Sequence, residues 1–305
     1  FFFSSRRRHT RCSRDWVQTC ALPISVLVDL NISIWTARKL DKKVSEEINV
    51  AKNTTTNAGN YSKNLLAGSG TLAEINKYAA AIRHWHNTQT LPWSDNGTRM
   101  LPMANFMEYK QGLNVRIQTL QTLFDKFYIE YPQLVNDAAN KLGSLFDVSE
   151  YPDLDTVKSK FRCKYIFSPM PEAGDFRIDA ENDLKRELSE QYEEEKNIKL
   201  TEAMNEAWNR LHDVLLHMSE RMEDTVDEKG EKVRKKFRDS VLENPAELCG
   251  LLTKLNVTKD PHLEDARKML EASIAGVDIK DLRDSEAKRV EVKQKVDDIL
   301  KKFNW

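Results

Sequence analysis

The sequence predicts a mostly α-helical protein in which long antiparallel, coiled-coil-like helices accompany a small β-sheet of two or three strands. The 305 residues include only 10 glycines and 9 prolines, and 31% are charged, which favours long helices over a fold of strands and turns. Two long stretches repeat apolar residues at intervals of three and four, and one short stretch alternates apolar with polar residues. A chain of this length can bury one or two hydrophobic cores.

The first 24 residues differ in character from the rest of the chain. They contain five arginines, one aspartate and two of the four cysteines, and no apolar periodicity relates them to a core. The run from Ser4 to Ile24 resembles the translation of a short-read sequencing adapter, so we expect residues 1–24 to be an artefactual or disordered leader. The alternative is an arginine-rich transit peptide. The weakly apolar stretch 21–30 is too short and too interrupted for a signal core or a membrane span.

Residues 26–35 alternate in the manner of a half-buried strand. The apolar residues at alternate positions share one face: Val26, Val28, Leu30, Ile32 and Ile34. A charged helix is predicted over 37–51, followed by a polar loop. The next helix is predicted to begin at a capping box formed by Thr71 and Glu74 and to end near Asn87.

A long helix follows the predicted loop 91–102. Its apolar residues are spaced 7, 4, 3, 4, 3 and 4 apart, as expected for a helix that packs along another at a shallow angle: Phe106, Leu113, Ile117, Leu120, Phe124, Phe127 and Tyr131. Pro132 is expected to stop or kink this helix, with a shorter helix over 133–142. Residues 164–168 and 175–178 are strand candidates, and they are the expected partners of the strand at 26–35, because an isolated strand is not stable.

A second long helix is predicted over 179–225. Its apolar stripe has spacings of 4, 4, 3, 4, 3, 4 and 4: Leu200, Met204, Trp208, Leu211, Leu215, Met218, Met222 and Val226. We expect the stripe at 113–124 to pack against the stripe at 211–218. Asn244 before Pro245 and Asp260 before Pro261 predict two further helix starts. The last helix is predicted over 279–303.

These elements suggest three regions: the leader 1–24, a region 25–178 that closes the small sheet, and a coiled-coil-like region 179–305. Without the leader the chain has 42 basic and 47 acidic residues, a net charge of −5, which disfavours broad binding to nucleic acid or anionic lipid. No stretch approaches the ~20 apolar residues of a membrane span. Cys163 and Cys249 are far apart and lack a CxxC partner, as expected for reduced thiols of a cytoplasmic protein.

No complete catalytic or binding motif occurs, so we predict no catalytic, cofactor-binding or metal-binding residue and no cofactor. His84 and His86 are two residues apart, and on a helix such side chains diverge by about 200°, too far to chelate one ion. Gly68-Ser69-Gly70-Thr71 lacks the lysine of a P-loop and is interpreted as a helix end followed by a capped helix. The candidates for contact with nucleic acid are Arg234, Lys235, Lys236 and Arg238, although acidic residues flank this run.

One segment resembles a known family. The 13 residues Leu27-Val28-Asp29-Leu30-Asn31-Ile32-Ser33-Ile34-Trp35-Thr36-Ala37-Arg38-Lys39 are similar to the start of an uncharacterised phage and bacterial family, domain of unknown function 3150, and the rest of the chain matches loosely. The resemblance implies a strand, a basic helix start and long charged helices. It also implies that the gene lies near genes for MoxR-type ATPases and von Willebrand-A-type proteins. The family has no established catalytic residues.

The expected function is therefore non-enzymatic. We predict a cytoplasmic interaction protein of phage or bacterial origin that presents helical arms to a protein partner, with an AAA-type ATPase as the best single candidate and no role at a membrane. A nucleic-acid-associated phage protein that uses residues 234–238 is one alternative. An enzyme with a site assembled around Trp35 and His84 is another. The oligomeric state stays open.

Overall fold

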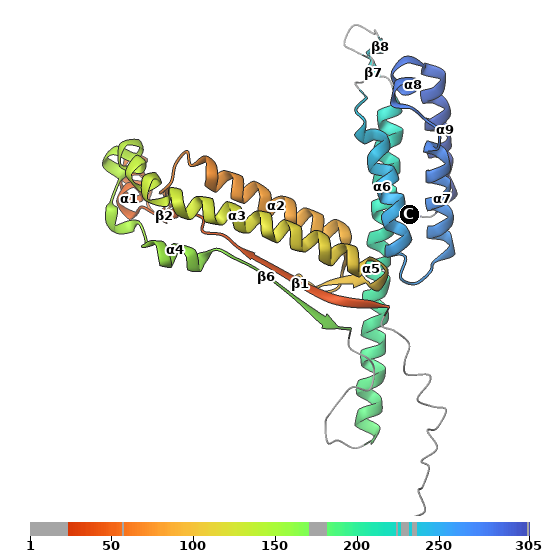
Figure 1. Cartoon of the computed structure of the whole chain (residues 1–305), viewed down its shortest axis with the longest axis horizontal. Coiled ribbons are helices and arrows are strands. Elements are labelled where there is room, and N and C mark those ends of the chain that lie inside the picture. The colour runs from red at the N-terminus through yellow and green to blue at the C-terminus, as the bar shows by residue number, and fades with distance from the viewer. Residues whose placement is uncertain are drawn as a thin grey trace, which may run out of the picture.

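The computed structural model describes residues 24–56, 58–170, 182–223, 225–226, 232–233, 237–303 and 305. The leader up to residue 23, the strand candidate 175–178 and the basic residues Arg234, Lys235 and Lys236 lie outside these ranges. Two units are visible in Figure 1, and they meet crosswise. We call the unit from β1 to β6 the arm and the unit from α5 to α9 the bundle.

The predicted fold class is confirmed. The arm contains a helix of 40 residues, α3 (Met103–Leu142), and the bundle contains one of 41 residues, α5 (Asn182–Met222). The main sheet has four antiparallel strands in the order β4-β5-β1-β6. Two-stranded sheets are formed by β2 with β3 and by β7 (Thr225–Val226) with β8 (Lys232–Val233).

Strand β1 (Ser25–Ser33) is central in the main sheet, as its alternating pattern predicts. It pairs along its length with β6 (Arg162–Pro169), so the expected pairing with residues 164–168 is confirmed. Its other edge pairs over four residues with β5 (Arg99–Pro102), which in turn pairs with β4 (Leu91–Pro92). The prediction of a loop at 91–102 was therefore wrong at both ends of that stretch. The strands form there because Leu91, Met100 and Leu101 are fully buried.

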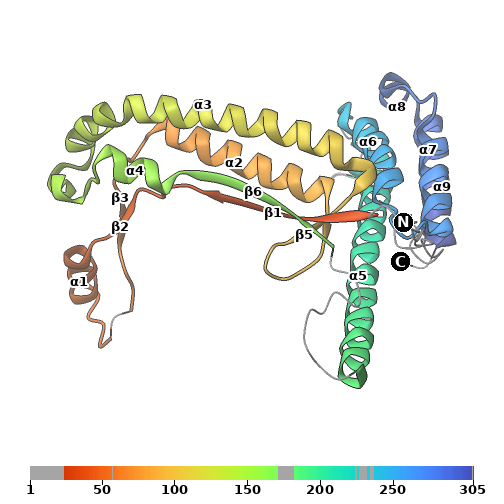
Figure 2. The same cartoon turned by 60° about the horizontal axis from the view of Figure 1, so that its bottom comes forward.

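Helices α2 (Gly70–Gln89) and α3 form an antiparallel hairpin over one face of the sheet (Figure 2). The even-numbered apolar residues of β1 point into this layer, as predicted. The far end of the arm consists of β2 (Arg38–Leu40), α1 (Lys42–Ala51), β3 (Ser62–Asn64), two 3-10 turns (Gly143–Leu145 and Val148–Glu150) and α4 (Leu154–Lys160).

The apolar stripe of α3 is buried, as predicted, but its expected partner was wrong. Leu113, Leu120 and Phe124 belong to a core formed with α2 and β1. Leu211 and Leu215 of α5 belong to a different core, which they form with the other bundle helices and with Leu27, Leu91 and Met100 at the near end of the sheet. Spacing identified two buried stripes but not which surface covers each one.

Several helix boundaries also differ from the predictions. Helix α1 starts at Lys42 rather than at residue 37, because residues 38–40 pair as β2. The cap of α2 is Ser69, and the predicted capping residue Thr71 instead donates its hydroxyl proton to Glu130 of α3. Helix α3 runs through Pro132 without stopping.

The bundle packs α5 against α6 (Ser240–Leu255), α7 (Pro261–Ile274), α8 (Ile279–Asp284) and α9 (Glu286–Lys302). Asp260 caps α7 as predicted. The predicted cap at Asn244 was wrong, because α6 begins four residues earlier and contains Pro245. The last predicted helix is divided at Ser285, which caps α9. Among the described residues, no helix combines the length and the apolar character that crossing a bilayer requires.

Candidate interaction surfaces

Arg210 joins the arm to the bundle, and Arg99 binds the same end of α2 from within the arm. Arg210 of α5 donates hydrogen bonds to the main-chain oxygens of Asn87, Thr88 and Thr90 at distances of 2.9–3.0 Å. Arg99 of β5 donates to Asn87 and Thr90 as well, at 3.2 and 3.1 Å. These carbonyls end α2 and have no partner within the helix, and the negative end of the helix dipole favours cations there. We call this contact the arginine joint.

The groove beside the arginine joint has a volume of about 610 Å³, and His84, Glu206, Asp213 and Glu247 are among its lining residues. Both arginines in it are already engaged with α2. Arg210 also forms an ion pair with Glu206 at 3.0 Å. Burial and the neighbouring Arg210 lower the pKa of Arg99. The groove lies between the two units, and its two arginines are occupied by α2 and Glu206.

His84 and His86 have different surroundings. His86 is buried, and its Nδ1 lies 2.7 Å from the hydroxyl of Tyr109. Burial, with a smaller effect of Arg99, lowers its pKa to about 4, so the ring is neutral at physiological pH. His84 is exposed. Within the described ranges, no group of three or more His, Cys, Asp or Glu side chains converges in a way that would hold a metal ion.

Gly112 of α3 lies directly against the indole of Trp85 on α2. The indole of Trp85 stacks on Tyr109, with ring centroids 5.1 Å apart, and the Arg116 guanidinium lies 4.0 Å from the indole centroid. A Cβ atom at Gly112 would lie 2.8 Å from Trp85 Cζ2, closer than real Cβ contacts. A side chain at this position of α3 is therefore excluded by the packing.

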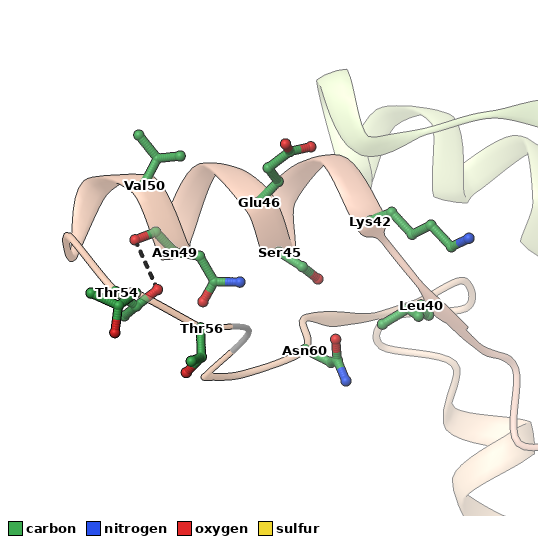
Figure 3. A pocket seen from close by; sticks show the side chains of 10 residues that line it. Leu40, Lys42, Ser45, Glu46, Asn49, Val50, Thr54, Thr56 and Asn60 are labelled. Atoms are coloured by element: carbon green, nitrogen blue, oxygen red, sulfur yellow. Dashed lines mark hydrogen bonds between the residues drawn. The ribbon is translucent and has the colours of Figure 1, made fainter.

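A pocket of about 530 Å³ lies at the tip of the arm, between α1 and the loop that follows it (Figure 3). The side chains that face this space carry hydroxyl and amide groups, among them Ser45, Thr56 and Asn60, whereas Glu46 points away from it (Figure 3). The pocket can donate and accept neutral hydrogen bonds. It contains no paired acid and base for chemistry.

A buried lysine connects α1 and its loop, at the tip of the arm, to the 3-10 turns after α3. Lys63 of β3 is 5% exposed, and its ammonium lies 2.7 Å from Glu150, 3.3 Å from Asp41 and 2.8 Å from the Leu145 oxygen. The bond to Glu150, with that to Asp41, raises the pKa of Lys63. This cluster fixes α1 and its loop to the 3-10 turns after α3.

The N-terminal half of helix α5 contains no buried residue among those that the structure describes. No residue from Asp183 to Glu202 is buried, whereas buried residues recur from Ala203 onward. This half extends away from the bundle in Figure 1, and we call it the free half of α5. It carries seven acidic and four basic residues. Ile198 is half exposed, between Glu194 and Glu202 on one face.

The residues proposed for other functions are not brought together. Of the four candidates for nucleic-acid contact, only Arg238 is described, and it is exposed just before α6. Trp35 is buried near Tyr131, at the end of α2–α3 where Thr71 meets Glu130. His84 lies 13 residues farther along α2, about 20 Å at 1.5 Å per residue. An active site that contains both Trp35 and His84 is not formed.

Sequence reasoning did not anticipate Arg99, Arg210 or Lys63. Each is a charged residue within a helix or strand, and no local pattern distinguishes it from a solvated one. The one available signal is that Arg210 directly precedes the buried Leu211, which places it beside the stripe.

Comparison with family models, with curated proteins and with solved structures found no match to this chain.

Proposed function

We propose that this protein is a non-enzymatic interaction protein that acts in the cytoplasm and presents its helical arms to a protein partner. The observation that carries the proposal is the free half of α5, in which none of the 20 residues is buried in the part of the chain that the structure describes. Among the described contacts of this half, only Leu200, near its C-terminal end, packs on the bundle core. A helix of that length is marginal alone in water. Its partial support within the chain comes from exposed ion pairs, such as Lys199 with Glu195 at 3.1 Å.

The free half of α5 has the chemistry of a docking surface rather than of a reactive site. Glu194, Ile198 and Glu202 lie on one face of the helix and combine an apolar contact with negative charge on either side. Such a face complements a shallow apolar groove with a basic rim. The free cysteines Cys163 and Cys249 agree with a reducing compartment.

The resemblance of residues 27–39 to domain of unknown function 3150 makes an AAA-type ATPase of the MoxR class the first partner to test. In this proposal the bundle anchors the free half of α5, and the arm holds a second surface at a distance from it. The partner's nucleotide hydrolysis supplies any chemistry, and this chain contributes binding.

The test compares the full chain with a variant that carries Glu194→Lys, Ile198→Ser and Glu202→Lys. These changes reverse the charge and remove the apolar contact on one exposed face, so the fold is expected to persist. A matched control carries Asp284→Lys and Asp298→Lys, two exposed positions on the bundle. Each protein is immobilised and exposed to a purified MoxR-type ATPase and to host lysate, and bound proteins are identified by mass spectrometry.

We expect wild type and the bundle control to bind the ATPase and the α5 variant to lose it. Circular dichroism of the three proteins establishes that helix content is unchanged. Equal binding by all three would exclude the free half of α5 as the docking surface. Absence of any bound protein, together with turnover of a small substrate by the purified chain, would exclude the proposed function.

A further inference from the structure

Strand β6 is a long edge strand. Among the residues that the structure describes, it ends the sheet order β4-β5-β1-β6 and pairs with β1 alone, from Arg162 opposite Ser33 to Pro169 opposite Val26. No described helix or strand lies along its outer side in Figure 1. An edge strand presents a row of main-chain N–H and C=O groups that can pair with another strand. At eight residues, β6 is longer than the short edges with which proteins commonly avoid such pairing.

The two faces of β6 have different environments. Cys163, Tyr165 and Phe167 point toward α3, where the Tyr165 hydroxyl donates to Asn114 at 3.1 Å and the Phe167 ring lies 5.0 Å from that of Phe106. These contacts hold the strand in place. The opposite face is open from Arg162 to Ile166, where Ile166 is 63% exposed, and is covered at the Ser168 end, where the paired Leu27 is buried in the bundle core.

The open face is basic. On β6 the basic residues of this face are Arg162 and Lys164, and the strand itself contains no acidic residue. The β1 residues opposite Arg162 and Lys164 are Ser33 and Asn31, which carry no charge. The one acidic β1 residue on this face, Asp29, lies opposite Ile166 and accepts a hydrogen bond from Thr98. Arg162 and Lys164 are exposed and form no ion pair with any residue that the structure describes. Their charges are available to a molecule that approaches the edge.

We propose that the free edge of β6 binds an extended acidic segment of a partner protein as an added strand. The added strand pairs with β6 through main-chain hydrogen bonds. Because strands have a period of two, every second side chain of the added strand lies on the open face. Acidic residues at those alternate positions fall beside Arg162 and Lys164. This inference rests on the proposed interaction function and adds a second surface with a partner of defined chemistry.

The same face is poorly suited to single-stranded nucleic acid. Sheets that bind single strands present aromatic side chains on which bases stack. On β6 the aromatic residues Tyr165 and Phe167 point toward α3, and Phe161 just before the strand is buried. Two basic residues without a stacking surface match an acidic peptide better than an oligonucleotide.

The experiment uses the full chain and a fluorescent ten-residue peptide in which glutamate alternates with valine. Three control probes accompany it: the same peptide with lysine for glutamate, the same peptide with N-methylated valines, and a ten-residue oligothymidylate. Fluorescence anisotropy measures binding, and hydrogen exchange measures protection of the main chain at residues 162–169. The variant carries Arg162→Glu and Lys164→Glu. The matched control carries Lys77→Glu and Lys110→Glu, exposed positions on α2 and α3.

We expect the glutamate peptide to bind and to slow exchange at residues 162–169. Reversal of the two β6 charges should weaken binding roughly tenfold, as for the loss of two exposed ion pairs, while the matched control changes it less than about twofold. The N-methylated peptide should not bind, because strand pairing needs its N–H groups. Equal binding of the lysine peptide, or binding without protection of β6, would overturn the proposal.

Three other outcomes would also overturn it. Absence of binding at millimolar peptide, or tighter binding of the oligothymidylate, excludes the acidic strand as the guest. A concentration-dependent dimer with protected β6 amides shows that a second copy occupies the edge. Each result leaves the ATPase capture by the free half of α5 unaffected, because that test depends on residues of the bundle, so failure of one proposal is distinguishable from failure of the other.

Discussion

Replacement of Gly112 by alanine tests how closely α2 and α3 approach each other. In an ordinary helix interior this change stabilises a protein by about 1 kcal/mol, because glycine loses more conformational entropy on folding. At Gly112 the new Cβ atom would lie 2.8 Å from Trp85 Cζ2 and 3.3 Å from Arg116 Nη1. The indole cannot retreat freely, because it stacks on Tyr109 and contacts the Arg116 guanidinium. Overpacking of this kind costs about 1–3 kcal/mol.

The two effects together predict that Gly112→Ala lowers the free energy of unfolding by up to about 2 kcal/mol. Gly250→Ala is the matched control, because Gly250 is an exposed residue of α6 and a Cβ atom there would meet nothing within 4 Å. This control should raise the free energy of unfolding by about 0.5–1 kcal/mol. Urea denaturation of both variants measures the difference. In a Trp85→Leu background the indole edge is absent, so Gly112→Ala should become neutral or stabilising. If Gly112→Ala stabilises wild type as much as Gly250→Ala does, the close approach of the helices is wrong.

Three further outcomes follow from buried side chains. Leu120→Ala should cost about 2–5 kcal/mol in urea denaturation, because Leu120 is fully buried, and the exposed Gln121→Ala should cost under about 0.5 kcal/mol; equal effects would contradict the burial of the α3 stripe. His86 has a pKa of about 4, below its usual 6.5, so the unfolded chain binds the proton first and stability should fall by about 3 kcal/mol as the pH decreases from 6.5 to 4. A His86→Gln variant should flatten the measured profile in that window, and an unchanged profile would show that other groups cause it. Burial raises the pKa of Cys249 to about 11, so alkylation followed by peptide mass spectrometry should modify it only after unfolding; burial also raises the pKa of the half-buried Cys163, which should react slowly in the native protein.

Local patterns predicted the elements that have one buried face. The alternation over 26–35 identified β1 and the residues that point into the arm, because a strand with one covered face must alternate. The three-and-four spacing identified α3 and α5 for the same reason at helical periodicity. In each case a single local repeat determines which side chains leave water.

The predictions that failed depend on contacts between distant parts of the chain. Residues 99–102 form β5 because β1 lies beside them, and their sequence contains a proline that indicated a loop. Pro132 was expected to stop or kink the helix. The helix does not stop there, because its packing continues on both sides: Tyr131 and Ala138 are buried on the same helix. Packing over the long helix offsets the loss of one main-chain hydrogen bond.

The candidate surfaces were only partly predictable. The free half of α5 is charged and contains no buried residue, in agreement with the run of glutamates at 193–195, which interrupts the apolar stripe of the helix. The basic face of β6 requires the sheet order, which shows that this strand is an edge. The arginine joint requires the position of α2 relative to α5. No local pattern in the chain specifies that position.

The arginine joint has a mechanical consequence. Helix α3 spans about 60 Å, and the arm is held to the bundle at one of its ends. A tilt of about 10° at that end would carry the tip through about 10 Å. The angle between arm and bundle is held by the hydrogen bonds from Arg210 to the last carbonyls of α2 and by Leu27, Leu91 and Met100, which are buried in the bundle core. Any change in this contact would be amplified along the arm.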